Sequence, residues 1–537
     1  MSDPTRTGSR RPSKFRGERE LVVLGKTVGA AGRRAGVAAP GPAAAPLESL
    51  TPLLNEYAAR MTSVFKAPSR PPAAARAGSR GAIAAAVPDL SQFYSVQVAE
   101  DRKDELAERL RRHPLIEAAF IKPAPEPPVR PPTAGGPASA LPSAVPAPPA
   151  PPAKFTPRQT YLDKGPGGID ARFAWTRPGG GGAGVNIIDV EGEWNFAHED
   201  LIVNQGGMIG GSGANSLDWR NHGTAVVGEI GADVNAFGCT GIAPEARVRA
   251  ISVFGNTGGS AAAISQAADA LVPGDIILIE LHLPGPRFSF LDRDDQLGYI
   301  AAEWWPDNLA AVVYATAVRG VIVVEAGGNG AENLDDPIYD TPAPGFPSSW
   351  RNPFRRSNPQ SGAVVVGAGA PPPGTHGNSA WGADRSRLDF SNYGARVDAQ
   401  GWGREVTTTG YGELSGAGGP ENRWYTDIFS GTSSASPIVV GALSCMQGAL
   451  RAAGKALLTP ASARSLLRST GSHQQAGPNG PATQRIGNRP DLREALVAAG
   501  LAGSTKTTKK SAAPPRATAK KAQAKRPAHA KRKRARR

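Results

Sequence analysis

Five short apolar runs between residues 158 and 501 constrain the fold of this 537-residue chain more than any other feature. Each run has the length of a buried strand, and helix-like segments separate the runs. Short apolar strands that alternate with helices form a parallel sheet with both faces covered. We therefore expect an α/β fold with a mostly parallel central sheet and helices on both faces. The expected strands are Val185–Val190, Val248–Val253, Ile276–Leu281, Val321–Glu325 and Ala363–Gly367, and the expected helices are His222–Gly231, Ser260–Leu271, Leu297–Arg319 and Ser433–Ala453.

Composition divides the chain into five parts. Gly (65) and Pro (50) are both abundant, which indicates that much of the chain lies outside a packed core. Near the N-terminus, apolar residues recur at helical spacing and a βαβ pattern follows over 93–121. The helical set is Leu47, Leu50, Leu54, Tyr57, Met61 and Val64. The expected parts are a disordered basic N-terminus (1–46), the helix with a small α+β unit (47–122), a Pro/Ala-rich linker (123–157), the main domain (158–502) and a disordered Lys/Arg-rich tail (503–537).

The positive charge of the chain belongs to its tail. Residues 503–537 hold fourteen Lys or Arg and no acid, and they account for all but one of the net +15 charges. Such a tail could bind nucleic acid or another polyanion electrostatically, with little sequence preference. A solubilising or surface-adhering tail is an equal alternative, because no base-reading module is visible.

Cysteine content and hydropathy leave the compartment open. Cys239 and Cys445 are too few for a disulfide framework; they could pair, but two buried thiols are the favoured reading. No apolar stretch reaches the roughly 18 residues of a membrane span. The run Leu21–Leu24 is too short for a secretory signal and is soon followed by Lys26. We expect a cytoplasmic protein, or one exported by an unrecognised route.

Three segments carry the residue types of nucleophilic catalysis. Asp189 follows an apolar strand, and the carboxyl ends of parallel strands form the edge where α/β enzymes place their sites. His222 stands in an Asn-His-Gly-Thr segment before a helix. Ser433 stands in Gly-Thr-Ser-Ser-Ala-Ser-Pro, where a helix N-terminus favours a developing oxyanion. Taken singly, these residues could be a capping Asp, a structural His and an N-cap Ser, and Ser434 and Ser436 are nearby alternatives.

Together, these segments resemble the motifs of the subtilase family, whose triad occurs in the order Asp, His, Ser. The resemblance covers about 158–500. It implies a serine endopeptidase in which Ser433 is the nucleophile, His222 the general base and Asp189 the residue that orients His222. It also implies that Asn329, in a segment similar to the family's Ala-Ala-Gly-Asn, donates to the oxyanion beside the Ser433 amide. An Asn chosen for a left-handed turn is the structural alternative.

Other segments match the family less closely. Glu280 and Pro284 stand where the family's substrate-pairing strand is expected, so no side-chain preference is predicted. Asp200 stands in a segment that resembles the family's His-Pro-Asp-Leu, and Asn235 lies thirteen residues after His222, as in family members with a calcium loop. Both offer hard oxygen ligands, so a structural Ca²⁺ ion is a hypothesis that the resemblance implies. The alternative is a surface Asp and a turn Asn. No other cofactor is expected.

The N-terminal unit resembles the second half of a subtilase propeptide. As a hypothesis, cleavage would fall within about 123–160. Proteins or peptides are the expected substrates, and the protein is expected to be a monomer. A pseudo-enzyme on the same fold is the rival interpretation, disfavoured because all the implied catalytic residue types are present.

Overall fold

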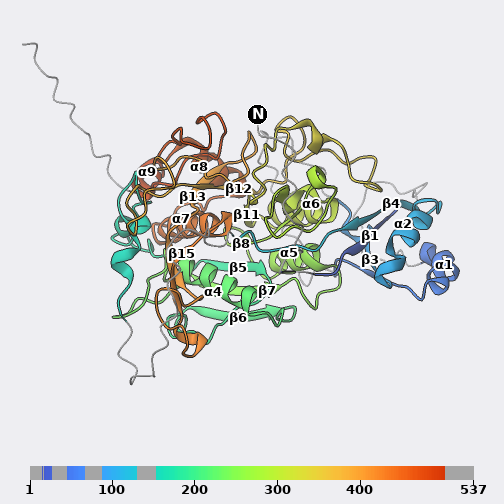
Figure 1. Cartoon of the computed structure of the whole chain (residues 1–537), viewed down its shortest axis with the longest axis horizontal. Helices are drawn as coiled ribbons and strands as arrows, with labels where there is room; N and C mark the ends of the chain where they lie inside the picture. The colour runs from blue at the N-terminus through green and yellow to red at the C-terminus, as the bar shows by residue number, and fades with distance from the viewer. Residues whose placement is uncertain (1–14, 16, 27–44, 67–87, 130–152, 502–537) are drawn as a thin grey trace, which may run out of the picture. The chain divides into compact units, whose positions relative to one another are not determined.

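The computed structural model describes residues 15, 17–26, 45–66, 88–129 and 153–501 (Figure 1). A seven-stranded sheet forms the centre of the main domain, in the order β13-β12-β11-β8-β5-β7-β6, with every neighbouring pair parallel. All five expected strands belong to this sheet, so the predicted fold class is confirmed. The strands are β5 (Asn186–Glu191), β6 (Gln205–Gly210), β7 (Arg247–Ser252), β8 (Ile276–Ile279), β11 (Ile322–Ala326), β12 (Val364–Gly369) and β13 (Ala399–Trp402).

Helices flank the sheet in pairs. α4 packs against α7, and α5 packs against α6. Two of the predicted boundaries were wrong. Helix α4, predicted to begin at His222, begins at Leu217, so His222 lies inside it rather than at its start. The segment 297–319 is not one helix, because residues 299–301 form a strand and Pro306 starts a new helix at its first position. The helices are α3 (Ala171–Ala174), α4 (Leu217–Gly231), α5 (Gly259–Asp269), α6 (Pro306–Val313), α7 (Thr432–Ala452), α8 (Pro460–Ser469) and α9 (Leu492–Ala498).

Two small antiparallel pairs complete the main domain. β9 (His282–Pro284) pairs with β10 (Tyr299–Ala301), and β14 (Val406–Thr409) pairs with β15 (Tyr425–Phe429). The first pair continues from the central strand β8 and therefore extends beyond the carboxyl edge of the parallel sheet.

The N-terminal unit is a four-stranded antiparallel sheet in the order β2-β3-β1-β4. Part of the segment predicted to be disordered, Glu20–Gly25, forms the inner strand β1, because it pairs with strands about 70 and 100 residues later. The helix predicted over 47–64 is shorter, and its last residues form a strand. The elements are β1 (Glu20–Gly25), α1 (Thr51–Glu56), β2 (Arg60–Ser63), β3 (Phe93–Gln97), α2 (Lys103–Arg111) and β4 (Ile116–Lys122).

The N-terminal unit shares a core with the main domain. Phe120 of β4 packs its ring against Trp305 and Phe346. Lys122, which is fully buried, pairs with Asp307 of α6 and with Glu20 at 2.8 Å. A buried cation needs such partners, so this contact ties the two parts together.

The chain then leaves β4 and crosses the main domain as residues 123–129, the first part of the predicted linker. The predicted tail, 503–537, lies outside the described residues, as do 1–14, 27–44 and 130–152. Within the described residues no helix is long and apolar enough to cross a bilayer. Cys239 and Cys445 are both buried and free, as expected.

Candidate active site

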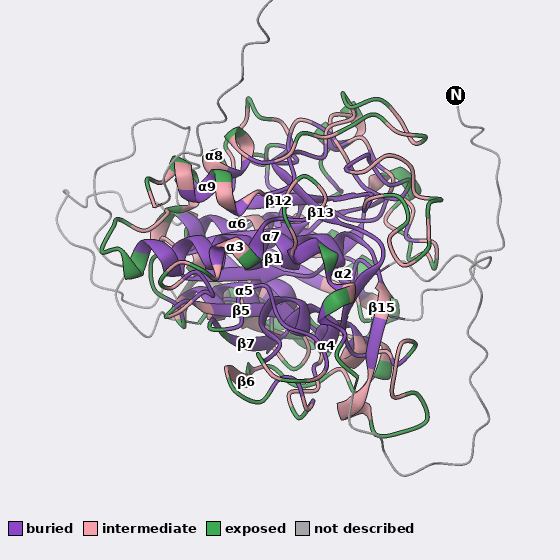
Figure 2. Ribbon diagram, turned by 90° about the vertical axis from the view of Figure 1, so that its left-hand side faces the viewer, coloured by how far each residue is buried: buried purple, intermediate pink, exposed green. Residues whose placement is uncertain are grey.

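The topology opens a site at the carboxyl edge of the sheet. From β5 the chain crosses to the edge strand β6 and returns to β7, which lies beside β5. It then continues on the other side of β5 with β8, β11, β12 and β13. Ligands in open α/β sheets bind where the strand order reverses in this way. Glu191 ends β5, Glu280 directly follows β8, and Asn329 follows β11. These strands and the helices α4 and α7 are largely buried (Figure 2).

His222 is oriented by Glu191. The ring atom Nδ1 of His222 lies 2.9 Å from Oε2 of Glu191, and both side chains are fully buried. The ring edge also packs against Phe429 at 5.6 Å. Gly223 allows the close approach, because a Cβ there would lie 2.5 Å from Oε1 of Glu191. The carboxylate that holds the imidazole is therefore Glu191.

This corrects the role predicted for Asp189. Its Oδ2 accepts a hydrogen bond from the indole of Trp194 at 2.8 Å, while Nδ1 of His222 is held by Glu191. Burial, and then the charge of Glu191, raise the pKa of Asp189 well above its usual value. Asp189 and Glu191 are alternate residues of one strand and face the same side. The sequence motif points to the first acid, Asp189, although Glu191 is the last residue of β5.

Ser433 lies in the first turn of α7, fully buried. Gly431, directly before the helix, has φ +119°, a left-handed value that favours glycine. The backbone amide of Ser433 donates to the carbonyl oxygen of Pro128 at 3.4 Å. In this structure the amide is therefore occupied by a carbonyl oxygen of the chain's own segment 126–129.

Asn329 is fixed next to Ser433. Its Oδ1 accepts hydrogen bonds from the amide of Thr432 at 2.9 Å and from its hydroxyl at 3.1 Å. Because Oδ1 is held in this way, the Nδ2 group remains as the donor, and it now donates to Gln296 Oε1 at 3.1 Å. Asn329 is thus held by its oxygen at the start of α7, and its N–H groups are its donors.

Glu280 adds a third buried carboxyl group to the site. It accepts a hydrogen bond from the hydroxyl of Ser436. Burial raises the pKa of Glu280 well above its usual value, and the charges of Asp189 and Glu191 act in the same direction. Burial likewise raises the pKa of Glu191. An imidazolium at His222 would offset that effect on Glu191, because an opposite charge favours the carboxylate.

The residues predicted to hold calcium meet, but not as a ligand pair. Asn235 Nδ2 donates to Asp200 Oδ1 at 2.6 Å, and the amide of Cys239 donates to Asp200 Oδ2 at 2.6 Å. Both carboxylate oxygens are thus occupied, and Asn235 presents its nitrogen, so the donor set does not fit Ca²⁺, which takes oxygen ligands. No group of three or more His, Cys, Asp or Glu in the described part of the chain could hold a metal. We expect EGTA to leave the melting temperature unchanged; a clear decrease would restore the calcium hypothesis.

Asp200 should make stability depend on pH. Burial raises its pKa to about 7, although the Cys239 amide and Asn235 act the other way. An Asp in an unfolded chain titrates near pH 3.9, so between about pH 4 and 7 the folded state binds more protons. This contribution lowers the free energy of unfolding as pH rises through that window, by at most about 4 kcal/mol. In a Ser433→Ala background, urea unfolding of Asp200→Asn should show a flatter pH profile; parallel profiles would contradict the argument.

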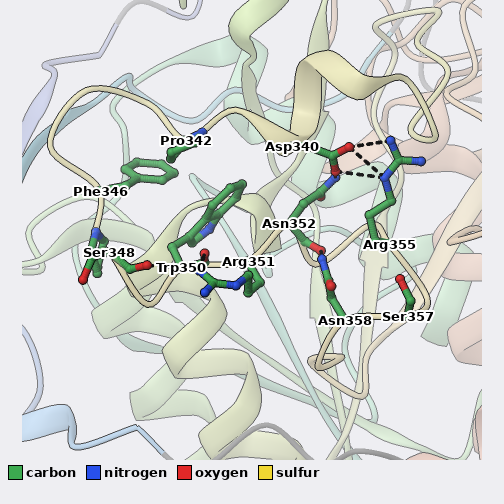
Figure 3. Close-up of a pocket in the computed structure, with 11 residues that line it drawn as sticks. Asp340, Pro342, Phe346, Ser348, Trp350, Arg351, Asn352, Arg355, Ser357 and Asn358 are labelled. Carbon is green, nitrogen blue, oxygen red and sulfur yellow. Dashed lines mark hydrogen bonds and ion pairs between the residues drawn. The ribbon is translucent and has the colours of Figure 1, made fainter.

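A cavity of about 490 Å³ lies away from these residues (Figure 3). It is formed by the loop 340–358, and Asp340 at its edge pairs with Arg355 at 2.6 Å. None of the predicted site residues lines it.

Comparisons with known proteins agree with the geometry. A family model described as "Subtilase family" matches residues 110–487. Subtilisin Savinase from Lederbergia lenta is 27% identical over 270 residues, which cover 50% of this chain and 77% of that protein. Subtilisin E from Bacillus subtilis (strain 168) is 25% identical over 263 residues, 49% of this chain and 55% of that protein. A solved structure of fervidolysin from Fervidobacterium pennivorans, a keratinolytic enzyme related to subtilisin, is also similar. The alignment covers 92% of this chain and 62% of the fervidolysin chain, with a TM-score of 0.50 and 18% sequence identity. This likeness concerns the fold alone.

Proposed function

The chain belongs to the subtilase family of serine endopeptidases, and on that premise we propose that it hydrolyses peptide bonds through an acyl-enzyme on Ser433. The observation that carries the proposal is the 2.9 Å contact of buried Glu191 with His222. In this proposal Nε2 of His222 accepts the Ser433 proton as general base and later returns it to the leaving amine. Glu191 holds the tautomer and stabilises the imidazolium.

The oxyanion hole would consist of the Ser433 amide and Nδ2 of Asn329. Both are preorganised, since Thr432 fixes the side chain of Asn329 and the start of α7 fixes the amide. The substrates would be proteins or peptides. Binding of polyanions by residues 503–537 and a monomeric state stay predictions from the sequence; gel shifts with and without the tail, across salt concentrations, test the former.

Active-site labelling tests the proposed function. A fluorophosphonate should react with Ser433 in the wild-type chain, since only an activated serine attacks it. Labelling should be lost in Ser433→Ala and retained in Ser434→Ala. The hydroxyl of Ser434 in the wild-type chain binds the backbone carbonyls of Trp402 and Gly431. A wild-type chain that is folded but not labelled would favour a pseudo-enzyme.

Asn329→Ala should lower kcat by about 10² to 10³, because one oxyanion donor is removed. KM should change little, since the donor acts mainly on the tetrahedral intermediate. Steady-state kinetics on a quenched peptide measure both constants. Loss of Thr432 packing could also contribute, so Asn329→Asp, which accepts the same Thr432 bonds but offers no N–H when ionised, serves as the matched variant. Activity of either variant close to wild type would exclude Asn329 from the oxyanion hole.

A further inference from the structure

The segment Glu126–Val129 lies across the candidate active site. The amide of Glu126 donates to the carbonyl of His282 at 3.0 Å, and the amide of His282 donates to the carbonyl of Glu126 at 3.0 Å. β9 pairs with β10 along its other edge. The segment is thus added to a sheet edge, as extended peptides are when proteins bind them through main-chain hydrogen bonds.

The carbonyl oxygen of Pro128 contacts the backbone amide of Ser433. It accepts the hydrogen bond of the Ser433 amide, and Gln296 Nε2 donates to the preceding carbonyl, that of Pro127, at 3.0 Å. A Cβ added at Gly431 would lie 2.0 Å from Pro128 O and 3.2 Å from Asn329 Nδ2, so this oxygen lies near both proposed oxyanion donors. None of these bonds uses an N–H of residue 127 or 128. The cleft therefore accommodates proline at both positions.

The side chain of Glu126 occupies a closed, specific site. It is 1% exposed. The hydroxyl of Tyr299 donates to Glu126 Oε1 at 2.9 Å, while the amide of Arg293 donates to the same hydroxyl oxygen at 3.0 Å. Because the Tyr299 oxygen accepts the hydrogen bond of the Arg293 amide, the hydroxyl hydrogen of Tyr299 is the one that points to Glu126. A buried donor of this kind is costly to leave unpaired.

We propose that the cleft selects acidic, proline-containing peptides with a glutamate two residues before the residue whose carbonyl is attacked, and that Tyr299 is the specificity-determining residue. The proposal rests on the proposed function, because it interprets Glu126-Pro127-Pro128 as occupying the substrate's place. Peptides with alanine at the glutamate position would leave the Tyr299 hydroxyl unpaired in a dry site.

Hydrogen exchange tests the contact without any catalysis. The experiment uses the full chain carrying Ser433→Ala, which keeps the Ser433 amide and cannot cut itself by the proposed route. Adding Tyr299→Phe should speed exchange at the amides of Glu126 and His282 about tenfold or more, since a hydrogen bond to a carboxylate is lost. Tyr314→Phe is the matched control, because it removes a tyrosine bond to Asp269 at a different place. Equal exchange in the two variants would overturn the role of Tyr299.

Peptide kinetics test the selectivity. With the wild-type full chain, a quenched peptide containing Ala-Glu-Pro-Pro-Val should have a kcat/KM about 10 to 100 times that of its Ala-Ala-Pro-Pro-Val counterpart. The resident segment competes with both peptides alike, so the ratio is unaffected. In Tyr299→Phe the ratio should fall to about one, and in Tyr314→Phe it should persist. Equal cleavage of both peptides by wild type overturns the selectivity while the protease activity stands. No cleavage together with no fluorophosphonate labelling counts against the proposed function, and the exchange experiment still decides the contact.

Discussion

Ser433→Ala is expected to reduce turnover by about 10⁶-fold, because the acyl-enzyme cannot form without the hydroxyl and the remaining triad members cannot act alone. The rate left over would come from the oxyanion donors and from substrate binding. Turnover of a quenched peptide by purified chain measures the effect, with thermal unfolding as a check on the fold.

Neighbouring serines provide the controls for this substitution. The hydroxyls of Ser434 and Ser436 both donate to backbone carbonyls, and Ser436 also donates to Glu280. Ser434→Ala should stay within about tenfold of wild type, since no reacting atom is removed. If Ser433→Ala kept near-normal turnover while one of these variants lost it, the nucleophile would be reassigned.

Glu191→Gln should lower kcat by about 10⁴-fold, since an amide in place of the carboxylate favours the wrong imidazole tautomer and leaves the imidazolium unpaired. The substitution preserves size, so packing against Gly223 should survive. The measurement is kcat over a range of pH, with circular dichroism to confirm the fold.

Asp189→Asn is the matched comparison, because the sequence motif alone points to this residue. Its carboxyl group accepts a hydrogen bond from Trp194, Glu191 holds Nδ1 of His222, and burial favours the neutral form of Asp189. An asparagine can still accept from the indole, so turnover should change by about tenfold or less. The reverse ranking of the two variants would return the orienting role to Asp189.

The ambiguity between these two acids marks the limit of prediction from sequence. An apolar run with a carboxylate at its end predicts a site at the edge of a sheet, and all five predicted apolar runs form strands. It does not decide between Asp189 and Glu191, because alternate residues face the same side and differ only in position along the strand. The choice depends on the path of α4, which packs there through tertiary contacts. Ser216 at the N-cap position, with Asp218 in the first turn, was a usable signal that the helix begins at Leu217 and that His222 lies in its second turn.

Features that depend on distant pairing were less predictable. Glu20–Gly25 is stable as a strand because β3 and β4 lie on either side of it, and neither partner is near in sequence. The composition of residues 123–129 predicts a spacer. Their position depends on β9, more than 150 residues later, which offers an open edge to Glu126.

The two thiols have a consequence for where such an enzyme could work. Cys239 and Cys445 are fully buried, and burial raises the pKa of both thiols, so neither presents a thiolate to oxidants or alkylating reagents. With no other cysteine in the chain, there is no cross-link for a reductant to break. The fold should therefore hold equally well at reducing and oxidising potentials.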